Sequence, residues 1–382
     1  MVVGIGFVVS LAVVLNLVPL IRHKSDFFLR WYASKQLLEI DRPLYSTLNS
    51  EETELITYGE GGSSGYLGVT YYYPAFMLIL TAPLSYLPYP AAHLVWTIAG
   101  QLMLFVALWL LMNERGWPGT VNGRSLFLGL VTVSVPFLQH TIWGQFNTIG
   151  VLALAGAYLA LRKGHLVTAG VLATGLLFKP QAYLFPLLFL LFWALWRRSR
   201  WPFLTGFGVA SAALWGIGAL LEPGWVRSFL TALAGYEPAG SVVDLFFNPY
   251  QITAVILTLY ALAVMVGARE TEPGDPAWIA ALATAAALWA LIVPILGLFH
   301  LLIFPAVLVL LLPQWRARKW VAWSLLGVWA AGWAAFLAGL AIGDGSHIRW
   351  TGLAYEAVLP VAILALSWPA YRHAWRKQRV LL

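Results

Sequence analysis

Long apolar runs, separated by short polar segments, dominate the chain. A helix that crosses a bilayer needs about 20 apolar residues, with a range of about 17–25. The strict alternation typical of a membrane β-strand does not occur. The runs therefore predict membrane-spanning helices, of which the shorter ones can be tilted, broken or re-entrant. We expect about twelve spans, at residues 2–21, 90–112, 125–140, 146–162, 165–180, 182–196, 202–221, 250–268, 277–298, 300–313, 320–342 and 352–370.

A long polar segment, residues 22–73, follows the first span. Within it, residues 26–39 combine good helix formers with spaced apolar positions, which predicts a short helix. The polar, Gly- and Ser-rich residues 46–70 predict a mobile loop. Residues 74–87 then predict a second short helix, which lies in the membrane interface rather than crossing it.

The composition supports a membrane protein. Of the 382 residues, 60% are hydrophobic and only 10% are charged, and the mean hydropathy is +0.78. A soluble domain has about 25% charged residues, so the predicted fold class is an all-α polytopic membrane protein. The net charge of +7 does not indicate nucleic-acid binding, because the basic residues cluster in short loops between spans. The chain has no cysteine, which excludes disulfides and thiolate chemistry.

The charge distribution orients the predicted spans. Twelve spans put both termini on one side, and most of the 23 Lys and Arg residues fall in loops on that side. This excess predicts a cytoplasmic side, so the long loops 22–73 and 222–249 face outward. Residues 225–235 of the second loop predict an amphipathic interfacial helix. Residues 2–21 lack a basic segment before them and a clear cleavage site after them, so we interpret them as a retained span. We predict one membrane domain, residues 1–382.

Asp26 follows the first predicted span directly and starts the predicted helix 26–39. A carboxylate beside the membrane surface can act as a general base that removes a proton from an acceptor hydroxyl. The helix dipole favours an acid at this position. An acid at a helix start is also commonly an N-cap or a surface residue, and position alone favours that structural role.

Two amides lie in a polar turn, Trp143–Asn147, at the outer end of the third span. Gln145 and Asn147 offer hydrogen-bond donors and acceptors beside an aromatic side chain, which suits a sugar ring or a phosphate. The alternative is a simple connection between two helices. In that case Gly144 permits the turn and Asn147 caps the next helix.

Two ionisable side chains lie in or beside apolar spans. Lys179 ends an apolar run without an acid nearby in sequence, and Pro180 follows it. A charge at the centre of a span costs about 2.5–3.5 kcal/mol, so Lys179 either binds the phosphate of a lipid-linked donor or snorkels to the interface. His300 either contacts a phosphate or hydroxyl in a cavity or is a hydrogen-bonded interior imidazole.

Further candidates lie on the two long loops. Arg227 can bind an acceptor, and Tyr71–Tyr73 either stack on a sugar or anchor the chain at the interface. The sequence has no carboxylates or histidines at metal-ligand spacing and no nucleotide-binding glycine motif. We therefore predict neither a metal ion nor another cofactor.

Several short motifs occur in one order along the chain: Ser25-Asp26-Phe27 with Tyr32, then Tyr72-Tyr73-Pro74, Gly144-Gln145-x-Asn147, Lys179-Pro180-Gln181 and the late His300. In this order they resemble glycosyltransferase family 87, a family of membrane enzymes with the GT-C fold. The likeness covers roughly residues 1–310, and the family includes mannosyltransferases that use polyprenol-phosphate-mannose. The chain departs from the family around His300, where it lacks a Trp and a second His, and at Asp41–Tyr45, which lacks a Gly.

The resemblance implies a GT-C fold with a short-helix first outer loop, and it implies that Asp26 is the catalytic base. It also implies that Lys179 and Gln181 line the donor cavity, beside the polar turn with Gln145 and Asn147. Together with the residues above, we expect donor contacts from Arg30, Gln145, Asn147, Lys179, Gln181 and His300, and acceptor contacts from Tyr32, Tyr73 and Arg227.

Our leading hypothesis is an inverting glycosyltransferase in a bacterial plasma membrane. It moves a sugar, with mannose favoured, from a polyprenyl-phosphate donor to a lipid-linked or glycan acceptor on the outer face. One alternative is a transporter or flippase for a lipid-linked sugar, although most spans lack the mid-span charges that ion coupling needs. The other is a non-catalytic scaffold, which needs no fixed acid and cation.

Overall fold

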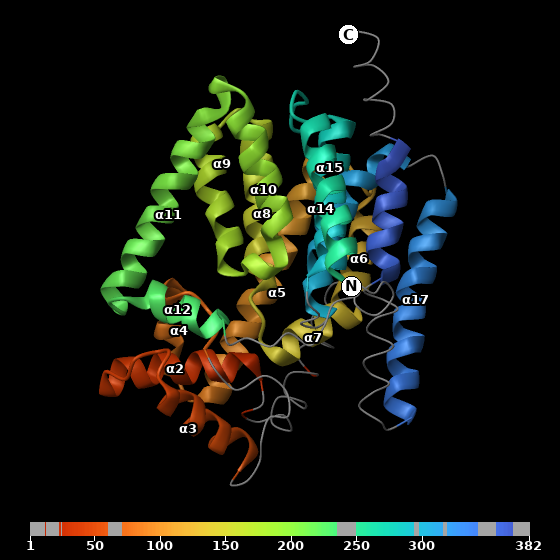
Figure 1. Ribbon diagram of the computed structural model, residues 1–382. Helices are drawn as coiled ribbons and strands as arrows, with labels where there is room; N and C mark the ends of the chain where they lie inside the picture. Colours follow the sequence, from red (N-terminus) through yellow and green to blue (C-terminus); the bar gives the residue numbers. More distant parts are fainter. Residues whose placement is uncertain are drawn as a thin grey trace.

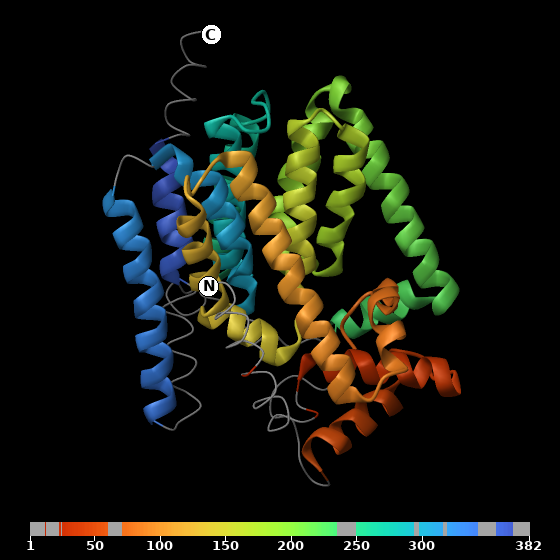
Figure 2. The ribbon, with the colours of Figure 1, turned by 180° about the vertical axis from the view of Figure 1, so that it is seen from behind.

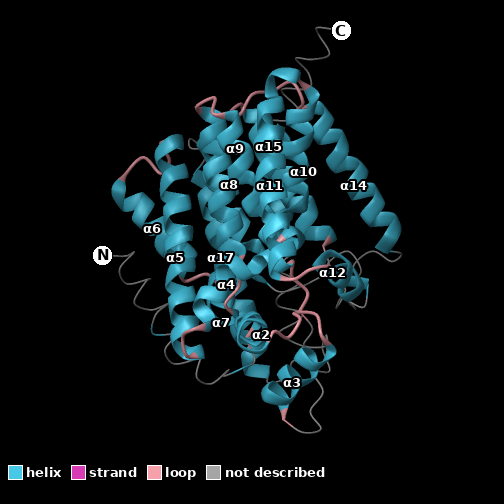
Figure 3. Ribbon diagram, turned by 90° about the vertical axis from the view of Figure 1, so that its left-hand side faces the viewer, coloured by secondary structure: helices cyan, strands magenta, loops and turns pink. Residues whose placement is uncertain are grey.

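The chain is helical, and no strand occurs in the part that the structure describes (Figure 3). This confirms the all-α prediction for those residues. The first predicted span, residues 2–21, lies outside them apart from Ala12. The structure is a computed structural model that describes Ala12, His23 and residues 25–59, 71–234, 250–293, 298–315, 319–342 and 357–369.

Most helices run side by side in a bundle (Figure 1). The largest apolar cluster lies inside it, where Leu104, Leu154, Leu190 and Leu310 are almost completely buried. The bundle consists of α5 (Tyr89–Arg115), α6 (Val121–Thr132), α8 (Asn147–Arg162), α9 (Leu166–Ala173), α10 (Pro180–Trp196), α11 (Trp201–Leu221), α14 (Tyr250–Gly267), α15 (Pro276–Ile292), α16 (Ile303–Leu311), α17 (Lys319–Ile342) and a last helix, Ala357–Pro369.

A layer of shorter helices gathers at one end of this bundle, and the same arrangement is seen from behind (Figure 2). These helices confirm the predicted short helices at 26–39, 74–87 and 225–235. In the first of them, the Ser25 side chain accepts a hydrogen bond from the backbone N of Phe28 at 3.1 Å and so caps the helix. The layer consists of α2 (Asp26–Ile40), α3 (Thr47–Tyr58), η2 (Ala75–Met77) with α4 (Leu78–Ser85), α7 (Val135–Trp143) and α12 (Trp225–Ala234).

The prediction of a loop over residues 46–70 is wrong for its first half, where α3 forms. Ser46 caps this helix by accepting a hydrogen bond from the backbone N of Asn49 at 3.3 Å. Asn49 and Thr53 are buried against the rest of the loop. A polar helix of this kind lacks the apolar periodicity that sequence analysis detects, because it is held by its cap and by buried polar contacts. Residues 60–70 lie outside the described residues.

Three described helical segments are long and apolar enough to cross a membrane by themselves. A fourth is obtained if the bent pair α6–α7 counts as one span. The total of about twelve spans and the GT-C topology therefore stay predictions. The three segments are Tyr89–Arg115, Arg198–Leu221 and Leu298–Trp315.

The predicted span 125–140 is broken into α6 and α7, which meet at 56°. Ser134 caps α7 by accepting a hydrogen bond from the backbone N of Phe137 at 3.4 Å, and Pro136 occupies the first turn. Proline suits a helix start because the missing N–H has no partner there anyway. The break turns α7 across the end of the bundle, so that its last residues approach α2.

Two further predicted spans depart from the α-helix beside candidate residues. The span at 165–180 tightens into a 3₁₀ turn, Thr174–Phe178, and α10 begins at Pro180. The helix predicted for 277–298 ends at Ile292, and a second 3₁₀ turn, Leu298–Leu302, precedes α16. Lys179 thus lies at a break between helices, and His300 lies in a 3₁₀ turn.

Loops that are predicted to be cytoplasmic lie together at the other end of the bundle. The Arg162 Nε and Glu114 Oε1 atoms are 3.1 Å apart, and the Arg200 Nη2 and Glu272 Oε1 atoms are 2.8 Å apart. These pairs join loops that are far apart in sequence. The two ends of the bundle therefore differ in character, with ion-paired short loops at one end and the short-helix layer at the other.

Two glycines let α9 and α11 pack backbone against backbone. A Cβ atom added at Gly206 would lie 2.2 Å from the Val167 carbonyl oxygen, and one added at Gly170 would lie 2.0 Å from the Phe203 carbonyl oxygen. Small residues allow this close approach between membrane helices. Gly208, an exposed residue of α11, has nothing within 4 Å of a Cβ atom added there.

We expect Gly206→Ala to destabilise the protein by about 1–3 kcal/mol, because the backbone of α9 would have to move away. Gly208→Ala is the matched control and should not lower the stability, because alanine is the better helix former and nothing lies within 4 Å of the added Cβ atom. The measurement is thermal unfolding of both variants in the same detergent. Equal melting temperatures for the two variants would contradict the close approach of α9 and α11.

Candidate functional site

Asp26 and Gln145 meet at the junction of the bundle and the short-helix layer. Asp26 is half-buried in the first turn of α2, and its Oδ2 atom accepts a hydrogen bond from the Gln145 side-chain amide. Ser25 is the residue that caps α2, so the alternative role of Asp26 as an N-cap is wrong. Its position in the first turn, where the helix dipole favours an acid, is confirmed.

Gly144 places Gln145 against α2. Its φ of 59° is in the left-handed region and ends α7, as the sequence predicted for the turn. A Cβ atom at this position would lie 2.4 Å from the Cβ atom of Phe27 on α2. The Gly144 carbonyl accepts hydrogen bonds from Arg30 Nη1 and from Trp96 Nε1, each at 3.1 Å. Glycine is therefore required here both by the backbone conformation and by the closeness of α2.

Lys179 approaches the same amide from the opposite side. Its Nζ atom donates to Gln145 Oε1 and, at 2.9 Å, to Asn147 Oδ1, and it lies 4.3 Å from the centre of the Phe299 ring. The residue is only 2% exposed, so the snorkelling alternative is wrong. Phe146 rather than Asn147 is the N-cap residue of α8, and the Asn147 side chain binds Lys179 instead.

Arg30 is a second cation in this cluster and is completely buried. Its Nη2 atom donates to the Tyr73 hydroxyl and, at 3.4 Å, to Gln145 Oε1. The guanidinium carbon lies 4.1 Å from the centre of the Tyr73 ring and 4.3 Å from that of Phe146. Two aromatic faces thus hold Arg30 in one orientation, which is a favourable cation–π arrangement.

Together these residues form one hydrogen-bonded cluster around Gln145, which we call the Gln145 cluster. The Gln145 amide donates to the carboxylate of Asp26, and its carbonyl accepts from Lys179 and Arg30. A carboxylate beside two cations can combine a general base with groups that stabilise a developing negative charge. The cluster consists of Asp26, Arg30, Tyr73, Gln145, Asn147 and Lys179.

His300 and Gln181 lie near this cluster without a side-chain hydrogen bond to it among the described contacts. The His300 ring is buried, and neither ring nitrogen has a hydrogen-bond partner within the described part of the chain. Its turn is held by the backbone N of Leu298, which donates to Gln139 Oε1 at 3.1 Å. The Gln181 carbonyl accepts a hydrogen bond from Trp289 Nε1 at 2.9 Å.

The structure does not place Tyr32 in the Gln145 cluster. Its hydroxyl hydrogen-bonds to Glu52 on α3. Burial, and to a smaller extent this hydrogen bond, raises the pKa of Tyr32 above its usual range. Hydrogen bonds from Arg42 and then from Tyr32 lower the pKa of Glu52. Tyr32 therefore joins α2 to α3, a contact that the sequence could not reveal because the α3 helix itself was missed.

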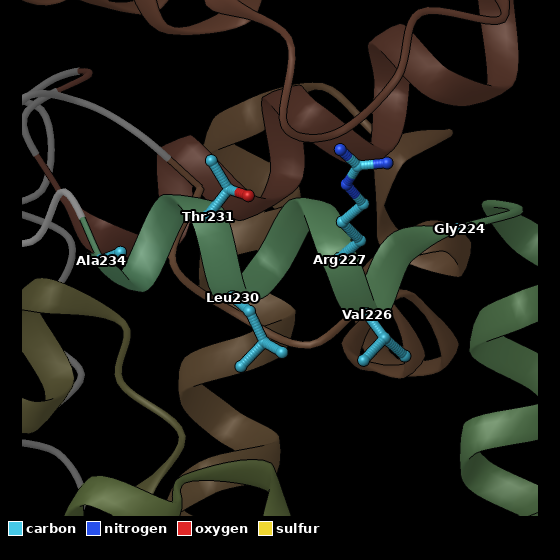
Figure 4. Close-up of a pocket in the computed structure, with 6 residues that line it drawn as sticks. All are labelled: Gly224, Val226, Arg227, Leu230, Thr231 and Ala234. Atoms are coloured by element: carbon cyan, nitrogen blue, oxygen red, sulfur yellow. The ribbon is translucent and has the colours of Figure 1, made fainter.

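Arg227 lies on α12, beside an open cavity of about 690 Å³ (Figure 4). The Arg227 and Thr231 side chains project from one side of the helix, and Val226 and Leu230 project from the other. No hydrogen bond or ion pair involves the Arg227 side chain within the described part of the chain. The cavity is lined by Gly224, Val226, Arg227, Leu230, Thr231 and Ala234.

A second group of polar residues, which the sequence did not reveal, contacts Ser25, the residue before Asp26. The Ser25 and Tyr89 hydroxyl oxygens are 2.5 Å apart, and the Tyr89 hydroxyl lies 3.2 Å from His93 Nδ1. The buried His140 lies within electrostatic reach of Lys179 and Arg30. The available signal was a histidine within an apolar run, the same signal that drew attention to His300.

The Gln145 cluster contains one carboxylate, two cations, two amides and the aromatic ring of Tyr73. Among the residues with described positions, no three His, Cys, Asp or Glu side chains come close enough together to hold a metal ion. Lys179 and Arg30 supply two positive charges to the Gln145 cluster, and both side chains are buried.

Comparison with known proteins gives one match. The family model described as glycosyltransferase family 87 matches residues 71–297, more than half of the 382 residues. The matched range includes Tyr73, Gln145, Asn147 and Lys179, but not α2 with Asp26 and Arg30, and it is narrower than the resemblance seen in the motifs. No curated protein and no solved structure matches the chain. With its apolar bundle and this match, the chain belongs to glycosyltransferase family 87 and is a membrane glycosyltransferase.

Proposed function

We propose that this glycosyltransferase moves a sugar, with mannose as the leading candidate, from a polyprenyl-phosphate donor to a hydroxyl of a lipid-linked or glycan acceptor. The Gln145 cluster is the proposed active site, and Asp26 is the proposed general base. The short-helix layer that holds it faces the outside of a bacterial plasma membrane in this proposal, as the positive-inside rule predicts.

The observation that carries the proposal is the double role of Gln145. One side chain links the half-buried carboxylate of Asp26 to the buried Lys179 and Arg30. These residues come from three segments that are far apart in sequence, and burying two cations without need would be costly. An anionic leaving group beside the cations and a hydroxyl beside the carboxylate would use both halves of this arrangement.

The proposed reaction is a single displacement. The acceptor oxygen forms a bond to the anomeric carbon while the bond from that carbon to the phosphate oxygen breaks. The proton of the acceptor hydroxyl passes to Asp26, and the electron pair leaves with polyprenyl phosphate. Attack from the face opposite the leaving group inverts the anomeric configuration. Lys179 and Arg30 stabilise the charge that develops on the phosphate.

The donor and acceptor then contact different parts of the site. Arg30, Gln145, Asn147 and Lys179 are the proposed donor side, and we place Gln181 and the buried ring of His300 next to them. On the acceptor side we propose Tyr73 and Arg227. Tyr32 is a weaker acceptor candidate than the sequence indicated, because its hydroxyl is engaged by Glu52.

Transfer is tested by incubating the purified protein in detergent with radiolabelled polyprenyl-phosphate-mannose and a membrane lipid extract. We expect label in a new glycolipid, with the opposite anomeric configuration to the donor. Other polyprenyl-phosphate sugars are tested in parallel. Label that crosses the membrane of a proteoliposome without forming any glycosidic bond would support the transporter alternative and contradict the proposal.

Arg227→Gln is expected to raise the KM for the acceptor about tenfold and to leave the KM for the donor unchanged. The reason is that a hydrogen bond to a charged group contributes about 1.5–3 kcal/mol, and about 1.4 kcal/mol corresponds to a factor of ten. Steady-state kinetics with each substrate varied in turn checks this. Arg124→Gln, on the predicted cytoplasmic side, is the control. An equal effect on both KM values would contradict an acceptor-specific role.

A further inference from the structure

Glu222 is a buried carboxylate outside the Gln145 cluster. It follows the last residue of α11, and only 7% of its surface is exposed. The ion pairs found within the described residues do not include it. Burial raises the pKa of Glu222, although hydrogen bonds from the backbone N–H groups of Leu44 and Tyr45 act in the opposite direction. A buried acid without a cation is costly, so its contacts call for an explanation.

Its contacts join the two long loops. The Glu222 Oε2 atom accepts a hydrogen bond from the backbone N of Leu44 at 2.8 Å, across 178 positions of sequence. Leu44 lies in the turn between α2 and α3, whereas Glu222 lies between α11 and α12. One carboxylate therefore ties the helix that carries Asp26 and Arg30 to the helix that carries Arg227.

The connection continues to the Gln145 cluster. The Tyr45 hydroxyl donates a hydrogen bond to the Tyr73 carbonyl at 2.6 Å. The hydroxyl of Tyr73 in turn accepts a hydrogen bond from Arg30. Hydrogen bonds and the covalent chain thus connect Glu222 to Arg30 through Leu44, Tyr45 and Tyr73.

Aromatic packing makes this connection rigid. The Tyr45 ring lies 5.6 Å from the ring of Tyr71 and 6.4 Å from that of Phe229 on α12. Leu44, Tyr71 and Trp225 are almost completely buried in one apolar cluster. A rigid environment passes a displacement of the Leu44–Tyr45 turn on to Tyr73, because close-packed side chains leave little room for independent adjustment.

We propose that Glu222 is a positioning residue that sets the register of α2 and Tyr73 against α12, and through Tyr73 the position of Arg30. It touches neither substrate. The carboxylate suits this task because it accepts a hydrogen bond from the backbone N of Leu44, which an apolar side chain cannot do. Only the kinetic readout of this inference rests on the proposed function.

Amide hydrogen exchange of the full-length protein in detergent tests the positioning role directly. In Glu222→Ala we expect exchange to become about tenfold faster in residues 41–46, at Tyr71–Tyr73 and in the first turns of α2, because loss of a charged hydrogen bond costs about 1.5–3 kcal/mol locally. Glu222→Gln keeps a carbonyl acceptor for Leu44 and should stay within about threefold of the wild type by the same reasoning. Glu270→Ala, an exposed acid at the other end of the bundle, is the control.

Faster exchange confined to residues 41–46 would overturn the proposal, because Glu222 would then stabilise only the turn that contains Leu44. If Glu222→Ala does not fold, Glu222→Gln and Tyr45→Phe decide the question. Tyr45→Phe removes the hydrogen bond to Tyr73, and it should speed exchange at Tyr71–Tyr73 while residues 41–44 stay protected. Unchanged exchange at Tyr71–Tyr73 in Tyr45→Phe would equally overturn the proposal.

The kinetic readout uses the same variants. Glu222→Ala should lower kcat about tenfold or more, since a small misplacement of reacting groups has a large effect on rate. The donor KM should change less than kcat, and Glu222→Gln should recover most of the activity. The double variant Glu222→Ala with Tyr45→Phe should be no slower than Glu222→Ala alone, because both changes break the same connection. If the two changes multiply their effects on kcat, the connection through Tyr45 is contradicted. An inactive wild type would contradict the proposed function but would not affect the exchange result.

Discussion

Asp26→Asn is expected to lower kcat for sugar transfer by about 10²–10⁴, the usual contribution of general acid–base catalysis. The asparagine carbonyl can still accept the hydrogen bond from Gln145 that Asp26 accepts now. The variant should therefore keep the geometry of the Gln145 cluster and lose only the ability to take a proton. The measurement is single-turnover transfer from radiolabelled polyprenyl-phosphate-mannose, together with thermal unfolding.

Glu39→Gln is the matched control for this variant. Glu39 is an exposed acid at the other end of α2, where its Oε1 atom lies 3.7 Å from Lys35 Nζ. Exposed pairs of this kind contribute little to stability, so activity and melting temperature should both match the wild type. If Asp26→Asn keeps full turnover, Asp26 is not the general base. That result would leave the family assignment unchanged.

Lys179→Met is expected to lower kcat by about 10²–10³, which is the effect of removing one group that stabilises developing negative charge. Methionine has a similar length and fills the same space without the charge. Loss of the Lys179 ammonium group leaves the side-chain carbonyl oxygens of Gln145 and Asn147 without this hydrogen-bond donor. A simple structural lysine would instead lower the melting temperature and leave kcat per folded molecule unchanged, so both quantities must be measured.

Two variants sharpen this result. Lys163→Met removes an exposed lysine from the loop after α8 and should have no effect on kcat. Lys179→Arg keeps the charge but has a planar, wider head group, which does not fit a site built for a compact ammonium. We expect it to recover part of the lost rate. A Lys179→Met variant as active as the Lys163→Met control would exclude phosphate stabilisation by Lys179.

The helical core of the fold could be predicted from the sequence, because long apolar segments in a membrane have few alternatives to the helix. The predicted ends of α5, α8, α10 and α11 agree with the structure to within a few residues. The prediction failed at α3, where a capped polar helix shows no apolar periodicity. It also did not locate the exact break between α6 and α7, since a proline permits a bend without fixing its angle.

The candidate site was predicted as residue types and not as a set of contacts. Asp26, Gln145, Asn147 and Lys179 were each chosen for local reasons, and each had a plausible structural alternative. Their convergence excludes capping by Asp26 and Asn147 and snorkelling by Lys179. Tyr32 looked equivalent to its neighbours along the chain, but the missed α3 helix supplies the Glu52 that engages it.

By itself, the sequence determined that this is a polytopic helical membrane protein, and its motifs indicated the family. Hydrophobicity and helical periodicity are local properties, so they can be recognised in the sequence without knowing which segments pack together. The tertiary structure alone decided that Gln145 lies between Asp26 and the cations Arg30 and Lys179, and that Glu222 holds Leu44. Such contacts depend on how separate segments pack. They join residues between 34 and 178 positions apart, so no single stretch of sequence reveals them.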